Sequence, residues 1–413
     1  MSKSSAAHVA IVVQNLPVPF DRRVWLECQA LRDAGYEVSV VCPKGPGDPS
    51  YELHEGVHLY KYRAFPPITH QAAFVGEYAY SVTASFRGLA KAWRRRPFQV
   101  VQLCNPPDVL WAAALPFKAR GARVVFDQHD LCPELYESRW PEGPRIVHRA
   151  LLATERITYA VADRVVSTNE SYRSVALRRG RKRPEHVTVV RTGPDPDRMR
   201  AGAPVEELRR GHKHLLAYLG VMGPQDGVDL ALHAMHHIVH THGRTDVGLT
   251  LIGSGDAAPA LHRLAAELNL GEHVHFTGRV PDAQVQEILS TAVVGLCPDP
   301  RNPLNDVSTM NKTMEYLAYG LPVVAFDLIE TKVSADSSAL YAQPNRTEDF
   351  AGKILELLDD ELRREQMGEA GRWRVEQVLA WRCQVPAYVA LYDELTARHV
   401  KRAAAPGGVR CAG

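Results

Sequence analysis

Residues 306–327 read DVSTMNKTMEYLAYGLPVVAFD and combine a short helix with a buried strand. Ser308 and Thr309 are residue types that cap helix N-termini, and Gly320 is the type that ends a helix, so the stretch predicts a helix over 310–318. The apolar run at 322–326 follows at once and predicts a buried strand. A helix that leads directly into a buried strand is typical of an α/β domain.

The same alternation extends along the rest of the chain. Short apolar runs predict strands, and the segments between them have the length of helices, so the pattern predicts doubly wound parallel sheets. In the second half of the chain the predicted strands are 214–220, 247–253, 273–278, 292–297 and 322–326. In the first half they are 8–13, 37–42, 99–103, 123–127, 164–168 and 187–190.

A segment rich in Pro and Gly, at 193–204, separates the two series of strands. The 413 residues are enough for two or three domains. We expect Rossmann-like domains over 1–195 and 196–380 that face a cleft, an amphipathic helix over 381–399 and a disordered tail over 400–413. Ligands of open α/β sheets bind beyond the carboxyl ends of the strands, so the loops there hold the candidate site.

The start of the helix predicted at 310–318 suits a diphosphate. Asn311 and Lys312 lie in its first turn, where free N–H groups, the helix dipole and a cation converge. Glu315 lies one turn further on, where a carboxylate can accept hydroxyls from an adjoining ribose. The alternative is an ordinary capped helix with a Glu–Lys pair on its surface.

Two other strand-to-helix turns are candidates for ligand contact. Arg22 and Arg23 open the first helix, where a bound anion would meet free N–H groups; alternatively, both are surface residues at a helix end. Gly253 and Gly255 let the backbone approach a ligand closely, although glycines also serve tight turns. The turn between the first predicted strand and the first helix lacks the sequence GxGxxG. Its absence argues against a nicotinamide- or flavin-binding site at this turn.

His129 follows the predicted strand 123–127, so it is expected to point toward the cleft with Asp130. A single histidine is more often a structural residue than a catalyst, and that alternative stays open. No HExxH, paired Cys or Asp-x-Asp pattern predicts a metal site, and no GxSxG predicts acyl transfer. The seven cysteines show no CxxC spacing, which fits reduced thiols in a cytoplasm.

Several blocks of the chain, taken together, resemble one enzyme family. In the second half these blocks are 219–232, 251–256, 275–281 and 311–327, and in the first half 19–43, 105–108 and 191–195. In their order and spacing they are similar to the retaining glycosyltransferases of family 4 (glycosyl transferases group 1), which have the GT-B fold. The resemblance covers roughly residues 9–395 and implies that the helix at 381–399 crosses back onto the first domain.

The resemblance also implies roles for individual residues. Glu315 would hold the ribose, Asn311 and Lys312 would lie by the diphosphate, and His129 would contact the transferred sugar. The implied catalytic residues are Lys312, His129 and Asp306. The implied donor-binding residues are Gly223, Gln225, Gly253, Gly255, Gly278, Arg279, Val280, Met310, Asn311, Lys312 and Glu315. The implied acceptor-binding residues are Arg22, Arg23, Asn105 and His129.

Two positions depart from the family pattern. The first Glu of the family's signature is Val307 here, and the neighbouring Asp306 is the candidate to replace it at the sugar hydroxyls. The usual Arg and Lys after the first strand of the second domain are also missing, with Gln225 and Asp226 in that loop. Much of the diphosphate charge would then rest on Lys312 and the helix N-terminus.

The implied reaction moves a sugar from a nucleotide diphosphate sugar, expected to be UDP-linked, to an acceptor hydroxyl with retention of anomeric configuration. We expect a hexosyl- or N-acetylhexosaminyltransferase of polysaccharide or glycoconjugate biosynthesis. Such an enzyme is expected to require no metal and no further cofactor. Its acceptor would be a carbohydrate, a lipid-linked molecule or a small molecule. The alternatives are a sugar-nucleotide epimerase or hydrolase of the same fold, or a non-catalytic binding subunit.

The net charge of +2 hides an asymmetry between the two halves. Residues 1–195 hold 27 Lys/Arg against 19 Asp/Glu, an excess of +8, whereas the remainder holds 22 against 28, an excess of −6. The basic residues gather at 91–96, around Trp93, and at 178–183. We expect a cytoplasmic protein whose clusters attach it to an anionic membrane surface, with no nucleic-acid partner; alternatively, the clusters are solvated helix ends. The longest apolar run, nine residues from Val109, is too short to span a bilayer.

Overall fold

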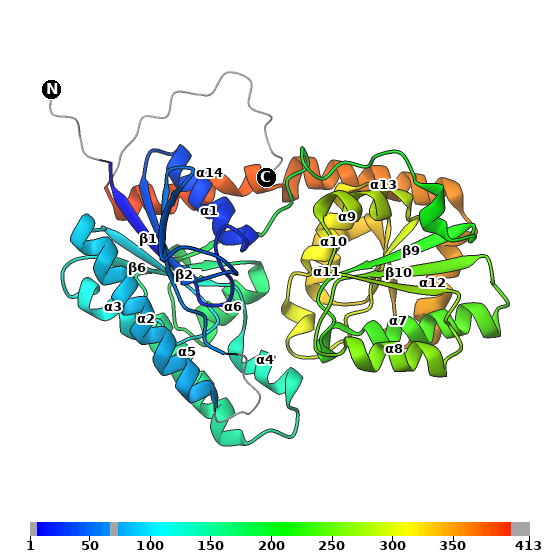
Figure 1. Cartoon of the computed structure of the whole chain (residues 1–413), viewed down its shortest axis with the longest axis horizontal. Helices are drawn as coiled ribbons and strands as arrows, with labels where there is room; N and C mark the ends of the chain where they lie inside the picture. Colours follow the sequence, from blue (N-terminus) through cyan, green and yellow to red (C-terminus); the bar gives the residue numbers. More distant parts are fainter. Residues whose placement is uncertain (1–5, 67–72, 398–413) are drawn as a thin grey trace. The chain divides into compact units, whose positions relative to one another are not determined.

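The computed structural model describes residues 6–66 and 73–397, and the chain divides into two compact units. The first unit comprises residues up to Thr192 together with the segment that starts at Gln384, and the second runs from Gly193 to Cys383 (Figure 1). The tail expected at 400–413 lies outside the described residues. Each unit is described by itself below.

The first unit is built on one sheet with the strand order β3-β4-β2-β1-β5-β6-β7-β8. All neighbouring strands pair in parallel except β3, which runs antiparallel to β4. Strands β1 and β5 are buried at every position, as expected of central parallel strands. The strands are β1 (His8–Val12), β2 (Glu37–Pro43), β3 (Tyr51–His54), β4 (Val57–Tyr62), β5 (Val100–Cys104), β6 (Arg123–Gln128), β7 (Arg164–Ser167) and β8 (Val187–Val189).

Helices cover both faces of this sheet. Helices α1 and α14 lie on one side, and α2, α3 and α5 on the other (Figure 1). The helices are α1 (Arg22–Asp33), α2 (Ala73–Arg95), α3 (Trp111–Lys118), α4 (Cys132–Arg139), α5 (Arg145–Val161), α6 (Glu170–Arg178) and α14 (Trp381–Leu395), with a 3-10 turn at Pro184–His186. Helix α1 is capped by the Asp21 side chain and is followed by Gly35 at a φ of 82°.

The second unit has the strand order β11-β10-β9-β12-β13-β14, all parallel. In sequence terms this is the order 3-2-1-4-5-6 of dinucleotide-binding sheets, and it reverses direction between β9 and β12. The strands are β9 (His214–Leu219), β10 (Val247–Ile252), β11 (Val274–Gly278), β12 (Val294–Cys297), β13 (Val323–Phe326) and β14 (Ala339–Ala342). The reversal point is where this topology places a ligand crevice.

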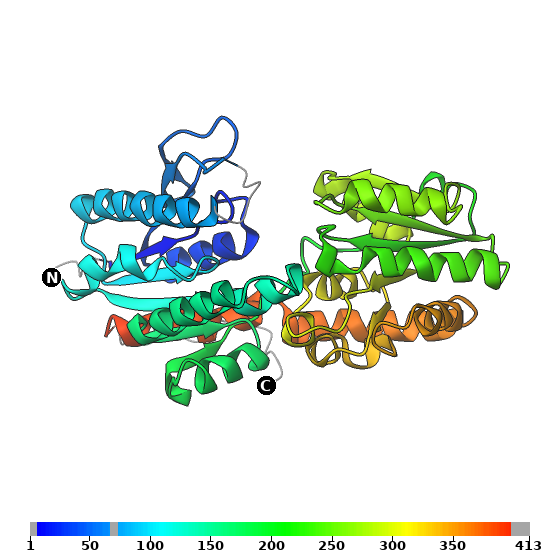
Figure 2. The same cartoon turned by 90° about the horizontal axis from the view of Figure 1, so that it is seen from below.

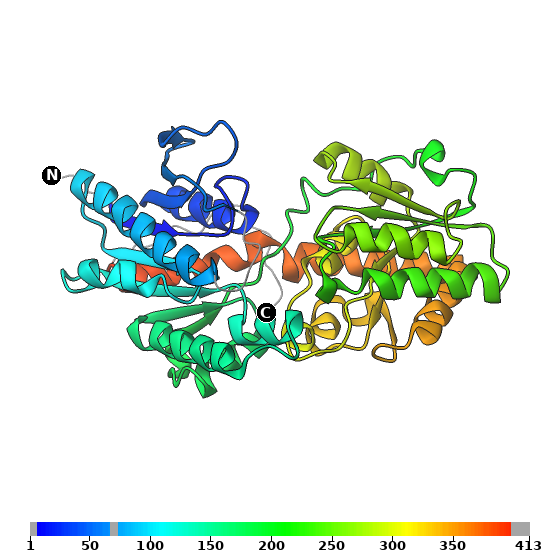
Figure 3. The ribbon, with the colours of Figure 1, turned by 60° about the horizontal axis from the view of Figure 1, so that its bottom comes forward.

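Helices α7, α8 and α12 pack on one face of the second sheet, and α9 and α10 on the other (Figures 1 and 2). Helix α7 continues into a π-helical turn, His237–Thr241, as one rod (Figure 3). The helices are α7 (Val228–His236), α8 (Ala258–Glu267), α9 (Asp282–Thr291), α10 (Asn311–Ala318), α11 (Ile329–Ala335), α12 (Thr347–Leu358) and α13 (Glu361–Arg374). Shorter turns lie at Glu206–Arg209, Pro224–Asp226, Asn305–Val307, Asp336–Ser338 and Val375–Leu379.

The predicted doubly wound α/β class is confirmed, with three strands and one helix start that the sequence pattern did not predict. Strands β3 and β4 form a hairpin across Glu55 and Gly56, both at positive φ, and β14 lies at the other sheet's edge. Helix α10 begins at Asn311 after the N-cap Met310, so Ser308 and Thr309 do not cap it; the Ser308 hydroxyl donates instead to the Leu304 carbonyl.

Candidate active site

The carboxyl ends of β9 and β12 and the start of α10 lie at the reversal point of the second sheet. Tyr316 of α10 ties the two strands together, because its hydroxyl accepts from the Leu219 N–H at 2.7 Å and donates to the Leu296 carbonyl at 3.2 Å. The first turn of α10 therefore lies next to Gly220, the residue that follows β9.

Lys312 is a largely buried cation at this reversal point, with its side chain 10% exposed. Its Nζ donates to Asp299 Oδ1 at 2.6 Å and lies 5.0 Å from the centre of the Tyr218 ring. Burial alone would lower the pKa of Lys312, but Asp299 and Tyr218 outweigh it and raise the pKa well above its ordinary value. The ammonium is thus held in one place and stays charged, as the diphosphate hypothesis requires, although Asp299 offsets part of its charge.

The predicted glycines bring two loops into direct backbone contact. A Cβ on Gly253, which has a φ of 128°, would lie 1.9 Å from the Gly220 carbonyl oxygen. A Cβ on Gly255 would lie 2.5 Å from the Met222 carbonyl oxygen. Only glycine fits at either position, so the loop after β10 closes against the loop after β9.

The loop that follows β9 carries two more of the predicted residues. The Gly223 N–H donates to Asp226 Oδ2 at 2.8 Å, so the carboxylate that stands in place of a basic residue closes the turn. Gln225 keeps its side chain partly buried, and its backbone carbonyl accepts from Asn305 Nδ2. No basic side chain of this loop supplements Lys312.

The remaining donor-site candidates surround these loops within the second unit. Gly278 ends β11 at a φ of 67°, and its carbonyl accepts from the Gly253 N–H, which joins the predicted donor-binding residues 278–280 to the glycine pair. Arg279 is exposed, and Val280 packs on the apolar core. In α10, Asn311 is exposed, whereas the N-cap Met310 and the second-turn Glu315 are partly buried.

Asp306 has a structural role that the sequence analysis did not predict. Its Oδ1 accepts from the N–H of Ile329, the first residue of α11, at 3.1 Å and lies 3.5 Å from Arg301 Nε. A carboxylate at a helix start is stabilised by the helix dipole and by the free N–H groups there. These two contacts engage the group that was expected to replace the missing Glu at the sugar.

In the first unit, the structure contradicts both interpretations of Arg23. It is buried at 6% exposure, and its guanidinium pairs with Asp127 Oδ1 at 2.8 Å and Glu27 Oε1 at 3.1 Å. It also donates to the Val190 carbonyl and to Thr192 Oγ1. Arg23 is therefore neither a surface residue nor a free anion contact, whereas Arg22 remains exposed.

His129 lies directly after β6, and its side chain is 15% exposed. Its Nε2 lies 2.5 Å from Asp127 Oδ2. Asp127 is fully buried, and Gln102 Nε2 also donates to its Oδ2 at 2.9 Å. The histidine thus reaches the carboxyl edge of the sheet as predicted, backed by a carboxylate that the sequence analysis had placed only within a strand.

Asn105, predicted to contact the acceptor, is buried and positions the His129 loop instead. Its Oδ1 accepts from the His129 N–H at 2.7 Å, and its Nδ2 donates to the Asp130 carbonyl at 2.8 Å and to Asp108 Oδ1 at 2.9 Å. With these bonds the amide is engaged at both ends.

Four side chains of the first unit have the composition of a metal site: Glu27, Cys104, Asp127 and His129, whose ligand atoms all lie within 4.8 Å of one another. The Arg23 guanidinium is bonded to two of them. Because this guanidinium already supplies the positive charge among the carboxylates, we assign the group as an ion-pair cluster.

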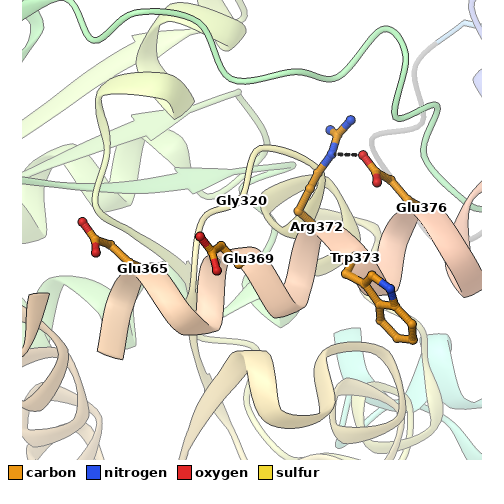
Figure 4. Close-up of a pocket in the computed structure, with 7 residues that line it drawn as sticks. Gly320, Glu365, Glu369, Arg372, Trp373 and Glu376 are labelled. Carbon is orange, nitrogen blue, oxygen red and sulfur yellow. Dashed lines mark hydrogen bonds and ion pairs between the residues drawn. The ribbon is translucent and has the colours of Figure 1, made fainter. Parts of the chain in front are cut away.

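A surface hollow of about 680 Å³ lies along α13, away from the predicted residues. It is lined by Gly320, Glu365, Gly368, Glu369, Arg372, Trp373 and Glu376 (Figure 4). Arg372 is bonded to Glu376 and to backbone carbonyls, so its charge is already engaged. None of the predicted site residues lines this hollow.

Sequence reasoning missed Asp299, Asp127, Glu27 and Gln102. Two of them left a signal in the pattern. Glu27 falls on the apolar stripe of α1, between Val24 and Leu31, and Asp127 closes the apolar run of β6. A charged residue at a position that faces the core calls for a buried partner.

Comparisons with known proteins match both halves of the chain to families of glycosyltransferases. Residues 21–198 match the family described as Glycosyltransferase Family 4, and residues 213–360 match Glycosyl transferases group 1. Over 274 residues, the chain is 25% identical to a D-inositol 3-phosphate glycosyltransferase of Corynebacterium aurimucosum, covering 63% of this chain and 62% of that protein.

A second relative is a GDP-mannose-dependent monoacylated alpha-(1-6)-phosphatidylinositol monomannoside mannosyltransferase of Corynebacterium glutamicum. It is 31% identical over 163 residues, which cover 38% of this chain and 41% of that protein. The chain thus spans about two to three fifths of the length of these relatives. Among solved structures, the sucrose-phosphate synthase of Thermosynechococcus elongatus has the same fold, with a TM-score of 0.77, 19% identity, and coverage of 95% of this chain and 99% of that one.

Proposed function

Because this chain belongs to the family-4 glycosyltransferases with the GT-B fold, we propose that it transfers a hexosyl or N-acetylhexosaminyl group from a nucleotide diphosphate sugar to an acceptor hydroxyl, with retention. The observation that carries the proposal is the buried, charged Lys312 in the first turn of α10, beside the backbone-packed glycine loops. A diphosphate is bound well by a cation, by the free N–H groups of a helix start and by glycine backbone that a ligand can approach closely.

In the proposed reaction the bond between the anomeric carbon and the leaving phosphate oxygen breaks, and the acceptor oxygen bonds to the same face of that carbon. The acceptor proton passes to a leaving phosphate oxygen. Lys312 contributes by stabilising the charge that develops on the diphosphate. Its ammonium has three N–H groups; Asp299 accepts from one and the Tyr218 hydroxyl lies in hydrogen-bond contact with the ammonium, which leaves at least one N–H group to meet the phosphate.

The nucleotide is proposed to be UDP, and GDP is its competitor. Several solved structures of similar fold hold UDP or UDP-glucose, whereas two curated relatives are named GDP-mannose-dependent. The test is an array of UDP- and GDP-sugars, screened for binding and slow hydrolysis, followed by acceptor screening and NMR of the product's anomeric configuration. Transfer with retention is the expected result. Epimerisation, or binding without turnover, would contradict the proposal in favour of an epimerase or a binding subunit.

We further propose that the first unit docks on an anionic membrane surface on the cytoplasmic side. None of the helices in the described part of the chain has both the length and the apolarity to cross a bilayer. Helix α5, at the front of the first unit in Figure 2, exposes Ile146 at 76% and Ile157 at 40%, next to the exposed Arg145, Arg149 and Arg156. Apolar side chains flanked by arginines suit a lipid interface.

The structure revises the anchor first expected for this docking. Trp93 packs in the core against Phe98, with ring centres 4.8 Å apart, so it is engaged there rather than at a headgroup. Arg96 is ion-paired with Glu37, and Arg179 with Glu134 and Glu155. The exposed Arg94 remains available, whereas the exposed Arg95 donates to the Tyr51 hydroxyl at 3.2 Å.

Sedimentation with anionic vesicles tests the docking. Binding is expected to be salt-sensitive and to fall when Ile146 and Arg149 become Ser, because the apolar and basic contributions are then both reduced. Exposed residues of the second unit, such as Arg263, provide matched Ser controls. Protein that stays in the supernatant at low salt would contradict the proposal.

A further inference from the structure

The imidazole of His129 is bonded on one side to a fully buried carboxylate. Its Nε2 and Asp127 Oδ2 are 2.5 Å apart. Two lone pairs repel each other at that distance, so a proton must lie between the two atoms. The ring therefore carries a hydrogen on Nε2 and donates it to Asp127.

A second contact to the same nitrogen is compatible with this assignment, because its donor has another acceptor. Arg23 Nε lies 3.1 Å from His129 Nε2, but a guanidinium has only donors and cannot bond to a protonated nitrogen. The same Arg23 Nε also donates to Asp127 Oδ2 at 3.5 Å and forms an ion pair with Glu27 Oε1 at 3.1 Å. Arg23 thus retains acceptors throughout, and His129 does not have to supply one.

The surroundings of Asp127 keep it ionised, so that it acts as an acceptor. Burial raises its pKa, but Arg23 and His129 outweigh this and hold the pKa below its ordinary value. Gln102 Nε2 donates to the same Oδ2. The Gln102 amide cannot reverse, because its oxygen would then face the ionised Asp127 carboxylate, which only accepts hydrogen bonds; in the observed orientation that oxygen accepts from the hydroxyls of Tyr388 and Tyr392.

The other ring nitrogen of His129 is available. Within the described residues its Nδ1 makes no hydrogen bond, and it is not among the buried polar atoms that lack one. The His129 backbone is fixed as well, because its N–H donates to Asn105 Oδ1 at 2.7 Å. The ring thus presents a lone pair outward, at the carboxyl end of β6.

We infer that Asp127 is a positioning residue that fixes His129 as the Nε2–H tautomer, so that Nδ1 accepts a hydrogen bond from a hydroxyl of a bound sugar or acceptor. The identity of that ligand rests on the proposed function, whereas the tautomer does not. Arg23 and Gln102 act through Asp127 by keeping its carboxylate ionised and oriented.

Long-range proton–nitrogen NMR of the full chain tests the tautomer directly, because it separates protonated from unprotonated ring nitrogens. A His129→Asn variant identifies the His129 signals. We expect an unprotonated Nδ1 in the wild type. In Asp127→Asn, Arg23 retains the amide oxygen and the amide NH₂ faces Nε2, so the hydrogen should move to Nδ1. Asp163→Asn, which alters a carboxylate of the same unit bonded to Lys118, should leave the signals unchanged.

Kinetics separate positioning from a merely structural role. Asp127→Asn is expected to lower kcat/KM at least tenfold, and the Asp127→Asn/His129→Asn double variant should be no slower than His129→Asn alone. Additive losses, or an unprotonated Nε2 in the wild type, would overturn the inference. The wild-type spectrum decides the tautomer even if Asp127→Asn does not fold. If no donor is turned over but Nδ1 is unprotonated, the proposed function fails and the tautomer assignment stands.

Discussion

Lys312 and Asp299 have to be interpreted together, because each is the other's buried partner. Lys312→Ala is expected to lower transfer about 100-fold, since the loss of one such donor costs roughly 3 kcal/mol of transition-state stabilisation. It also leaves Asp299 as an uncompensated buried charge, which costs about 3–5 kcal/mol of stability. The Lys312→Met/Asp299→Leu double variant should recover stability, measured by denaturant unfolding, but not activity. If the folded double variant transfers at a wild-type rate, Lys312 is not the diphosphate cation.

We expect Glu315 to contribute to substrate binding rather than to the chemical step. It lies in the second turn of α10, one turn beyond Lys312. Glu315→Ala should raise the donor KM with little change in kcat, because ribose contacts are similar in the ground and transition states. Initial rates over a range of donor concentrations measure both constants. A collapsed kcat with an unchanged KM would instead indicate a catalytic carboxylate.

Asp108 makes the stability of the first unit depend on pH. Burial raises its pKa to about 6, although the hydrogen bonds from Cys132 and Asn105 lower it. Between about pH 4 and pH 6 the folded state therefore holds a proton that the unfolded state has released. The stabilisation from this proton is fully present below about pH 4 and is lost as the pH rises through 6. The loss amounts to about 3 kcal/mol.

Asp108→Asn should remove most of this pH dependence. Urea unfolding of the wild type and of the variant at pH 5 and pH 8, followed by a probe in the first unit, measures the effect. The variant should gain stability relative to the wild type mainly at pH 8. Equal pH slopes for the two proteins would show that Asp108 is ionised in the fold.

At the scale of elements, the loops after β9 and β10 form one surface through backbone contact. Gly253→Ala should destabilise the second unit by about 2–4 kcal/mol and weaken donor binding, since its Cβ would meet the Gly220 carbonyl at 1.9 Å and its φ is 128°. The matched control is Gly271→Ala, whose Cβ would have nothing within 4 Å. Thermal unfolding and nucleotide titration compare the two variants. Equal thermal stability and equal nucleotide affinity of the two variants would mean that the contact between the two loops contributes to neither.

At the scale of the whole molecule, both chain segments that leave the first unit are anchored in one buried network. Arg23 bonds to Val190 and Thr192, just before the unit boundary. Gln102 accepts from Tyr388 and Tyr392 of α14, just after the chain returns at Gln384. These polar bonds, rather than apolar packing alone, set how α14 lies on its own sheet.

Removing the two hydroxyls should loosen α14. Tyr388→Phe/Tyr392→Phe leaves the buried Gln102 oxygen without these donors, which costs about 1–3 kcal/mol. Amide hydrogen exchange within α14 is expected to accelerate accordingly. Tyr36→Phe, which removes a partly buried bond to Asp393 on the same helix, should change exchange much less. Unchanged protection in the double variant would contradict this role of the network.

Much of the fold follows from local sequence pattern. Apolar runs, helix-length spacers and Gly320 were enough to predict the doubly wound class, since periodicity and turn chemistry act over a few residues. The same reasoning missed β3, β4 and β14, which lie at or next to sheet edges and carry weaker patterns. The helix predicted over 310–318 is observed at Asn311–Ala318 with Met310 as its N-cap, so the predicted caps Ser308 and Thr309 lie one to two residues too early.

What the sequence by itself determined is therefore the order of elements, the family-type donor block around 306–327 and the glycines at the strand ends. Only the tertiary structure decided which charges are buried and paired. Arg23 meets Asp127 from 104 residues away, Lys312 meets Asp299 across two elements, and Asp306 serves α11. The physical reason is that a charged side chain can be buried only where another element supplies an oppositely charged or hydrogen-bonding partner. The local sequence pattern does not show which element supplies that partner.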